Sequence, residues 1–157
     1  MFAWCRDSRP AGGEDFCRRL VDSPHRHEGG FRTKEFKVFV ADKPGELARV
    51  TDALAGAAVN IRAISSESRS DSSFLRIVTQ DAQTAEKALT MAGLKYELAD
   101  ILEIELLDRP GELAKVARRL ARAGVNVQSI YILGSRNGKT QIALVVDDTP
   151  RAKTALK

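Results

Sequence analysis

Histidine and cysteine are missing from most of this sequence. Residues 35–157 contain neither, and the two cysteines and two histidines of the 157-residue chain all lie before that segment. Nucleophilic catalysis and proton transfer rely heavily on these two residue types. Asp, Glu and Lys remain available, but no pair of them has a suggestive spacing in an apolar setting. We therefore expect no enzyme activity and no cofactor.

The residues that could ligate a metal are confined to the head of the chain, where Cys5, Cys17, His25 and His27 lie. Their spacing matches no standard C-x-x-C or His-spaced zinc pattern, so we predict no metal site and two free thiols. Residues 1–33 are rich in Gly, Arg and Asp and show no hydrophobic period. We expect an unstructured or poorly ordered leader, or translated sequence upstream of the true start.

Long apolar runs are also absent. No stretch approaches the roughly 18 residues that a membrane span needs, and the N-terminal MFAWCRDSRP lacks the apolar core of a secretory signal. With 43% hydrophobic and 29% charged residues, the composition is typical of a soluble globular protein. We expect a cytoplasmic protein with no membrane partner.

A one-sided charge is lacking as well. The chain carries a net charge of +4, but residues 35–157 hold 18 basic and 16 acidic residues. A basic stripe on one predicted helix invites a nucleic-acid interpretation, although a solvated helix face explains it more simply; its residues are Lys115, Arg118, Arg119 and Arg122. The predicted strands lack the paired exposed aromatic residues of an RNA-binding sheet, so nucleic acid is not an expected partner.

One stretch of the sequence occurs twice. Residues 42–64 align with residues 108–130 at an offset of 66, with 13 identical pairs in 23 positions. Chance does not produce a match of this density. The chain therefore contains a duplicated unit of about 65 residues, which is too long for most solenoid repeats and suits a small domain.

Each repeat begins with a strand and a helix. The segments EFKVFVAD (35–42) and ILEIELLD (101–108) alternate apolar residues with others, as half-buried strands do. The sequence Asp-basic-Pro-Gly-Glu then predicts a helix start, with Asp42 and Asp108 as N-caps and proline in the first turn. Apolar residues follow at helical spacing: Leu47, Val50, Leu54 and Ala57, then Leu113, Val116, Leu120 and Ala123.

The remaining elements follow the same order in both repeats. We expect second strands at 59–65 and 125–133, third strands at 74–79 and 141–146, and second helices at 82–92 and 150–157. A fourth strand is expected near 95–98. The order βαββαβ predicts an α+β protein with two ferredoxin-like units in tandem, each an antiparallel sheet with helices on one face. We place the domains at 34–98 and 99–157, joined closely at Ala99-Asp100.

The second repeat ends early. Nine residues complete the first repeat after AEKAL (85–89), whereas only Lys157 follows AKTAL (152–156). The fourth strand of the second repeat is therefore missing, and the strand within 100–107 should have an open edge. Either the chain is truncated or a partner strand completes the sheet; we favour truncation.

The repeated residues resemble the ACT domain family. Both DKPGEL…AVNI and DRPGEL…GVNV match its strand–helix junction and the start of its second strand, and the resemblance covers about residues 35–157. ACT domains are generally regulatory modules that bind small ligands, most often amino acids, at the interface between two ACT units. The resemblance implies a pocket made by the strand–helix loop and the start of the second strand.

That implied site has a physical rationale. A helix N-terminus suits a carboxylate, glycine lets a ligand approach the backbone, asparagine both donates and accepts, and aspartate attracts an ammonium group. The alternative is that these residues only start a helix and a turn. The candidate ligand-binding residues are Asp42, Pro44, Gly45, Glu46, Leu47, Asn60 and Ile61 in the first repeat, and Asp108, Pro110, Gly111, Glu112, Leu113, Asn126 and Val127 in the second.

From the repeat and the resemblance we expect an amino-acid sensor. A free amino acid held between ACT units would favour one relative orientation and so regulate a partner enzyme or regulator of amino-acid metabolism. We expect a homo-oligomer that forms through sheet or helix pairing. The alternatives are a ligand-free assembly module or regulatory subunit of a larger enzyme complex, and a repressor that binds nucleic acid.

Overall fold

The structure, a computed structural model, describes residues 33–69 and 72–157. The predictions made for the head of the chain lie outside the described residues. They are the leader, the two free cysteine thiols and the lack of a metal site at the two cysteines and two histidines. Residues 31–157 form one compact unit that holds both repeats.

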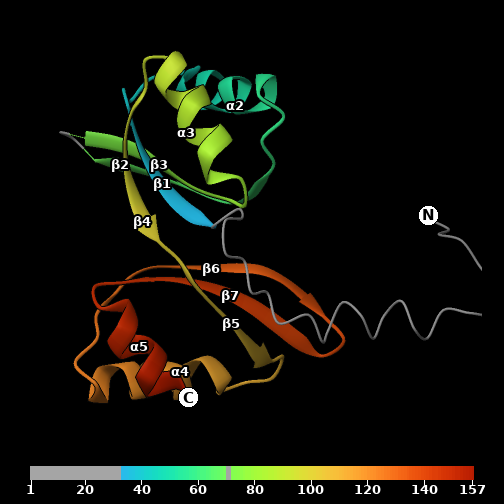
Figure 1. The fold of residues 1–157 in the computed structure, drawn as a ribbon, viewed down its shortest axis with the longest axis vertical. Helices are drawn as coiled ribbons and strands as arrows, with labels where there is room; N and C mark the ends of the chain where they lie inside the picture. Colours follow the sequence, from blue (N-terminus) through green and yellow to red (C-terminus); the bar gives the residue numbers. More distant parts are fainter. Residues whose placement is uncertain (1–32, 70–71) are drawn as a thin grey trace, which may run out of the picture. The chain divides into compact units, whose positions relative to one another are not determined.

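The first repeat has the predicted βαββαβ order. Its elements are β1 (Lys34–Val40), α2 (Glu46–Gly56), β2 (Ile61–Arg69), β3 (Ser72–Thr79), α3 (Ala82–Met91) and β4 (Lys95–Asp100). The four strands form one antiparallel sheet in the order β2-β3-β1-β4. Both helices lie on one face of this sheet, which is the ferredoxin-like arrangement expected from the sequence (Figure 1).

The second repeat follows the same course with one strand fewer. It comprises β5 (Leu102–Leu107), α4 (Glu112–Arg122), β6 (Val127–Arg136), β7 (Lys139–Val146) and α5 (Thr149–Leu156). Its sheet has the order β5-β7-β6, so β5 lies at an edge and pairs, among the described residues, with β7 alone. Within the described residues, β5 therefore has the edge position that the sequence predicts for it.

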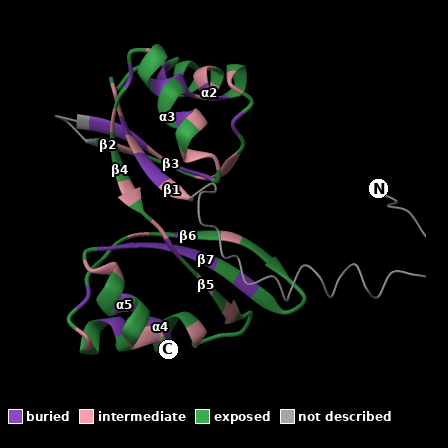
Figure 2. Cartoon of the chain, viewed as in Figure 1, coloured by how far each residue is buried: buried purple, intermediate pink, exposed green. Residues whose placement is uncertain are grey.

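Each repeat has its own apolar core between helices and sheet. Figure 2 shows the buried residues on the strands and on the inner sides of the helices. The first core contains Phe36, Val38, Val50, Leu54, Ile77 and Leu89, and the second contains Leu102, Val116, Leu120, Ile142, Leu144 and Ala152. The alternation of the strands therefore predicted their inner faces, and the helical spacing predicted the buried Val50, Leu54, Val116 and Leu120.

The predicted helical stripes are wrong at their first members. Leu47 is 53% exposed and Leu113 is 43% exposed, whereas Leu54 and Leu120 are each 1% exposed. The angle around the helix axis does not explain this difference in exposure, because Leu47 lies only about 20° from Leu54 around the helix. Position along the axis does: both exposed leucines lie in the first helical turn, beside the Pro-Gly loop.

Candidate functional site

Two loops of the same sequence lead into α2 and α4, and glycine, not aspartate, is the N-cap of each helix. Gly45 has φ of 96° and Gly111 has φ of 91°, and no side chain caps either helix. The prediction that Asp42 and Asp108 are the N-caps is therefore wrong, and the prolines precede the cap instead of lying in the first turn. The physical reason is the left-handed φ, which glycine adopts without strain.

The space in front of these loops is open. A Cβ placed on Gly45 or on Gly111 would meet no atom within 4 Å. The glycines are thus required by the backbone conformation and not by packing. The first N–H groups of both helices have no side-chain cap, so they remain able to bind an anion.

The loop aspartates lie in different surroundings. Asp42 accepts a hydrogen bond from the hydroxyl of Ser68 at 2.7 Å, which ties the loop to the end of β2. The backbone N–H of Asp108 donates to the carbonyl of Gly138 at 2.8 Å. Within the described part of the chain, the Asp108 carboxylate has no hydrogen bond or ion pair, which leaves it the freer acceptor of the two.

The glutamate that begins each helix lies between two basic side chains. Glu46 is paired with Lys43 at 3.5 Å and with Arg49 at 3.6 Å, while Glu112 is paired with Arg109 at 2.7 Å and with Lys115 at 2.8 Å. Hydrogen bonds from Lys115 and then Arg109 lower the pKa of the Glu112 carboxyl. Both glutamates are in the first helical turn, as expected, where a negative charge is favoured by the macrodipole.

The candidate asparagines lie at the opposite end of each sheet from the loops. Ile61, directly after Asn60, is level with Thr79 and Lys34, whereas Ser68 and Val40, near the Asp42 loop, are level with Ser73. At about 3.3 Å per residue the two ends are about 20 Å apart. The structure therefore does not bring the loop and Asn60 of one repeat together.

The second repeat has the same geometry. Val127 pairs with Val146, while Arg136 and Leu107 both pair with Lys139 at the loop end. The backbone of Asn126 is bonded to Asp147, whose carboxylate accepts from the Asn126 N–H at 3.0 Å and whose own N–H donates to the Asn126 carbonyl. Across residues 33–69 and 72–157, no hydrogen bond or ion pair joins either loop to either asparagine.

The basic stripe of α4 borders a groove of about 560 Å³ beside β5. The groove is lined by Ile104, Glu105, Leu106, Glu112, Lys115, Val116, Arg118, Arg119, Arg122 and Leu156. Two glutamates and an apolar floor accompany the arginines, which is not the continuous basic surface that a phosphate backbone favours. The first repeat has Asp52, Ala53 and Gly56 at the positions of the three arginines.

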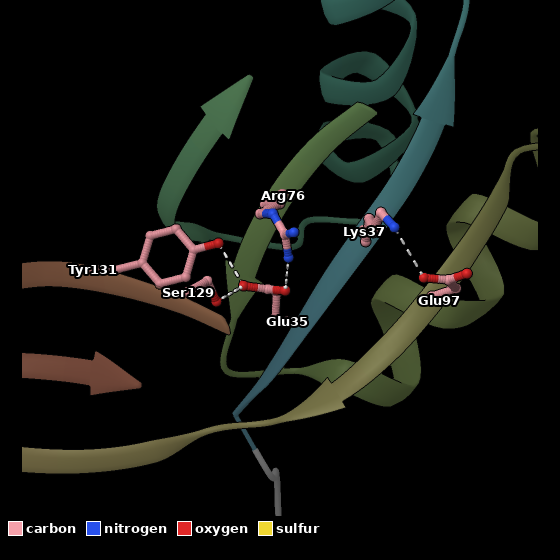
Figure 3. A network of polar contacts seen from close by, with 6 residues as sticks. All are labelled: Glu35, Lys37, Arg76, Glu97, Ser129 and Tyr131. Atoms are coloured by element: carbon pink, nitrogen blue, oxygen red, sulfur yellow. Dashed lines mark hydrogen bonds and ion pairs between the residues drawn. The ribbon is translucent and has the colours of Figure 1, made fainter. Parts of the chain in front are cut away.

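Sequence reasoning missed a polar joint between the repeats (Figure 3). Glu35 of β1, only 2% exposed, contacts Arg76 of its own sheet and Ser129 and Tyr131 of β6. A single acidic residue at the start of a strand does not signal burial. The one available signal was the repeat itself, because Glu35 aligns with Ile101 and Tyr131 aligns with Ser65.

Within residues 33–69 and 72–157, no group of three His, Cys, Asp or Glu side chains lies close enough to hold a metal ion. No helix in these ranges is long and apolar enough to cross a membrane.

Comparison with known proteins gives one family and a set of similar folds. The ACT domain model matches residues 35–90 and 101–157. The protein BT0572 from Bacteroides thetaiotaomicron is 26% identical, with a TM-score of 0.71 over 80% of this chain and 87% of that one. No curated protein matches the chain.

Two regulatory subunits of aspartate kinase share the fold. The subunit from Thermus thermophilus, in its ligand-free form, is 21% identical with a TM-score of 0.59 over 80% of this chain and 88% of that one. The subunit from Thermus flavus is 19% identical with a TM-score of 0.55 over 81% of this chain and 94% of that one. At these identities the likeness is one of fold alone.

Proposed function

This chain belongs to the ACT domain family, with two ACT domains in tandem, and from that membership we propose that it is a regulatory protein that binds a free amino acid. The observation that carries the proposal is the loop that both repeats retain. In each, a left-handed glycine begins an uncapped helix and faces open space. The N–H groups there would hold the ligand carboxylate, and the neighbouring aspartate would attract the ammonium group.

On this proposal, one complete site needs two ACT units. A free amino acid is far smaller than the roughly 20 Å that separates the loop from the asparagine within one repeat. A loop from one unit would therefore act with an asparagine from another, and the exposed Leu47 or Leu113 would contact the ligand side chain. If the second unit belongs to another copy of the chain, the protein is a homo-oligomer with ligand at its interface.

The proposed partner is an enzyme of amino-acid metabolism. Regulatory subunits of aspartate kinase have this fold. Bound ligand would favour one relative orientation of the ACT units, and the partner would respond to that orientation. A cytoplasmic location and the absence of enzyme activity stay predictions.

Thermal unfolding of the chain against each of the twenty amino acids at millimolar concentration tests the proposal. A ligand present at 100 times its Kd adds about 2.7 kcal/mol, a shift of several degrees for a chain of this size. We expect a shift with one amino acid or a few related ones. No shift with any of them would favour the alternative, a ligand-free assembly module.

Mixing of variants tests whether the site spans two chains. One variant carries Asn60→Ala and Asn126→Ala, the other Asp42→Ala and Asp108→Ala, and each alone should bind at least tenfold more weakly because a hydrogen bond to a charged group is lost. Mixed oligomers should regain part of the binding, since some interfaces combine an intact loop with an intact asparagine. Gln83→Ala, an exposed amide on α3, is the matched control and should leave affinity unchanged. Binding that never recovers on mixing would place the site within one chain.

A further inference from the structure

A buried carboxylate links the two repeats. The Oε1 atom of Glu35 accepts a hydrogen bond from Nη1 of Arg76 at 2.8 Å, and its Oε2 atom accepts from the hydroxyls of Ser129 and Tyr131, each at 2.5 Å (Figure 3). Glu35 and Arg76 belong to the first repeat and the two hydroxyls to the second. Ser65 of the first repeat also lies beside the Tyr131 side chain.

The two sides of this joint are built from equivalent positions of the repeat. Ser65 aligns with Tyr131, its own contact, so equivalent strands meet there as they do at a two-fold interface. The counterparts of Glu35, Arg76 and Ser129 are Ile101, Ala143 and Ala63. These three apolar residues belong to the small cluster of Val78, Tyr131 and Ala143 at the same joint.

These three positions are therefore polar in one repeat and apolar in the other. An apolar face tolerates a slide, because its contacts are not directional. A carboxylate that accepts two short hydroxyl bonds does not, since a slide of one strand residue, about 3.3 Å, would leave a buried charge without both donors. Replacing a buried ion pair with apolar residues often costs no stability, which points to specificity of orientation as the role of the polar set.

A second contact across the joint is weaker by comparison. Arg62 of β2 is paired with Glu103 of β5 at 2.7 Å, with side chains that are 16% and 36% exposed. Such a partly hydrated pair is screened by solvent and contributes little to fixing an orientation. Glu35 is the charged group of the joint that is removed from water.

We propose that Glu35 is a positioning residue that holds the two ACT domains in one relative orientation, and that this orientation sets the ligand affinity of the ACT sites. The first part stands on the geometry of the joint. The second part rests on the proposed function, because it needs a ligand. Coupling of this kind arises when ligand binds one of two orientations more tightly.

Distances between two spin labels test the first part without any ligand. The labels are placed by Lys87→Cys on α3 and Lys153→Cys on α5, both exposed, in a full-length chain carrying Cys5→Ser and Cys17→Ser. Dilution with unlabelled protein restricts the signal to distances within one chain. The wild type should give one narrow distance distribution.

Three variants test whether the hydrogen bonds of Glu35, and not apolar packing alone, hold the two domains in one orientation. Glu35→Gln, and separately Ser129→Ala with Tyr131→Phe, should broaden the distribution at unchanged helical content. The control is Glu97→Gln, which removes an acid paired with Lys37 inside the first repeat at 3.3 Å and should leave the distribution narrow (Figure 3). The variant with Ser129→Ala and Tyr131→Phe, called the hydroxyl variant, keeps the Glu35–Arg76 pair. It therefore still tests the proposal if Glu35→Gln does not fold. A narrow distance distribution in the hydroxyl variant would overturn the proposal that Glu35 holds the orientation of the two domains.

Ligand affinity tests the second part. For the amino acid that stabilises the wild type, the hydroxyl variant should show a Kd changed about fivefold or more, the usual lower range of allosteric coupling. A broadened distance distribution with an unchanged Kd would support the role of Glu35 in orientation and overturn its link to ligand affinity. If no amino acid binds the wild type, the proposed function and this second part fail together, while the spin-label result still decides the first.

Discussion

At the scale of single residues, the repeat provides its own comparison. Ala58 and Gly124 follow the first helix of each repeat and both have left-handed backbones, with φ of 56° and 68°. In both repeats the next N–H bonds to a carbonyl five residues earlier: Val59 to Leu54 and Val125 to Leu120. The same helix ending is thus made with glycine in one repeat and with alanine in the other.

We predict that Ala58→Gly stabilises the protein by about 1 kcal/mol. A left-handed conformation costs an L-residue about 1–2 kcal/mol, and the added chain entropy of glycine offsets part of the gain. Urea unfolding measures the change. The reverse substitution, Gly124→Ala, should destabilise by a similar amount, because alanine is strained at the left-handed φ of 68°. No clash adds to this cost, since the new Cβ would meet only an Arg151 side-chain atom at 3.8 Å. A loss of stability in Ala58→Gly would contradict the strain argument.

At the scale of helices and strands, burial depends on position along the axis as well as on periodicity. The helical spacing placed Leu47 and Leu54 on one stripe, yet one is 53% and the other 1% exposed. Periodicity reports an angle around a helix and not whether a neighbouring element lies opposite each turn. The first turn of α2 and of α4 therefore carries an exposed leucine that the pattern assigned to the core.

We predict that Leu54→Ala lowers the free energy of unfolding by about 2–5 kcal/mol, the cost of a cavity in a packed core. Leu47→Ala should change it by less than about 0.5 kcal/mol, as a surface substitution does. Leu120→Ala and Leu113→Ala form the matched pair in the second repeat. Chemical denaturation of all four variants checks the prediction, and a large loss in Leu47→Ala or Leu113→Ala would show that the first turn is packed in solution.

At the scale of the whole molecule, the joint between the repeats should give stability a distinct pH dependence. Burial, and then the hydrogen bond to Glu35, raises the pKa of the Tyr131 hydroxyl to about 12. An unfolded tyrosine ionises near pH 10. Above about pH 10 the unfolded chain therefore loses this proton while the folded chain keeps it, and stability falls as the pH rises toward 12.

The measurement is the free energy of unfolding between pH 8 and pH 12. The contribution of Tyr131 is complete below pH 10 and is lost across the window above it. Tyr131→Phe has no proton to lose at this position, so its stability should decline less steeply through the same window. Parallel curves for the variant and the wild type would mean that the hydroxyl is not buried against Glu35.

The sequence by itself determined the tandem α+β architecture of this protein. Alternating residues such as Phe36, Val38 and Val40 define a strand face locally, and the helical spacing of Val50 and Leu54 defines a helix face, so the duplicated βαββαβ order could be predicted without any long-range contact. The repeat also indicated the Pro-Gly loops as candidate ligand sites.

Only the tertiary structure decided the surroundings of the residues in the proposed site and in the joint between the repeats. The 20 Å between the Asp42 loop and Asn60 follows from strand register, which pairs residues far apart in the chain. Residue preferences alone assigned the N-cap of α2 to Asp42, whereas the left-handed turn of the backbone makes Gly45 the cap. The burial of Glu35 depends on a second repeat packing against it, and no local pattern around residue 35 carries that information.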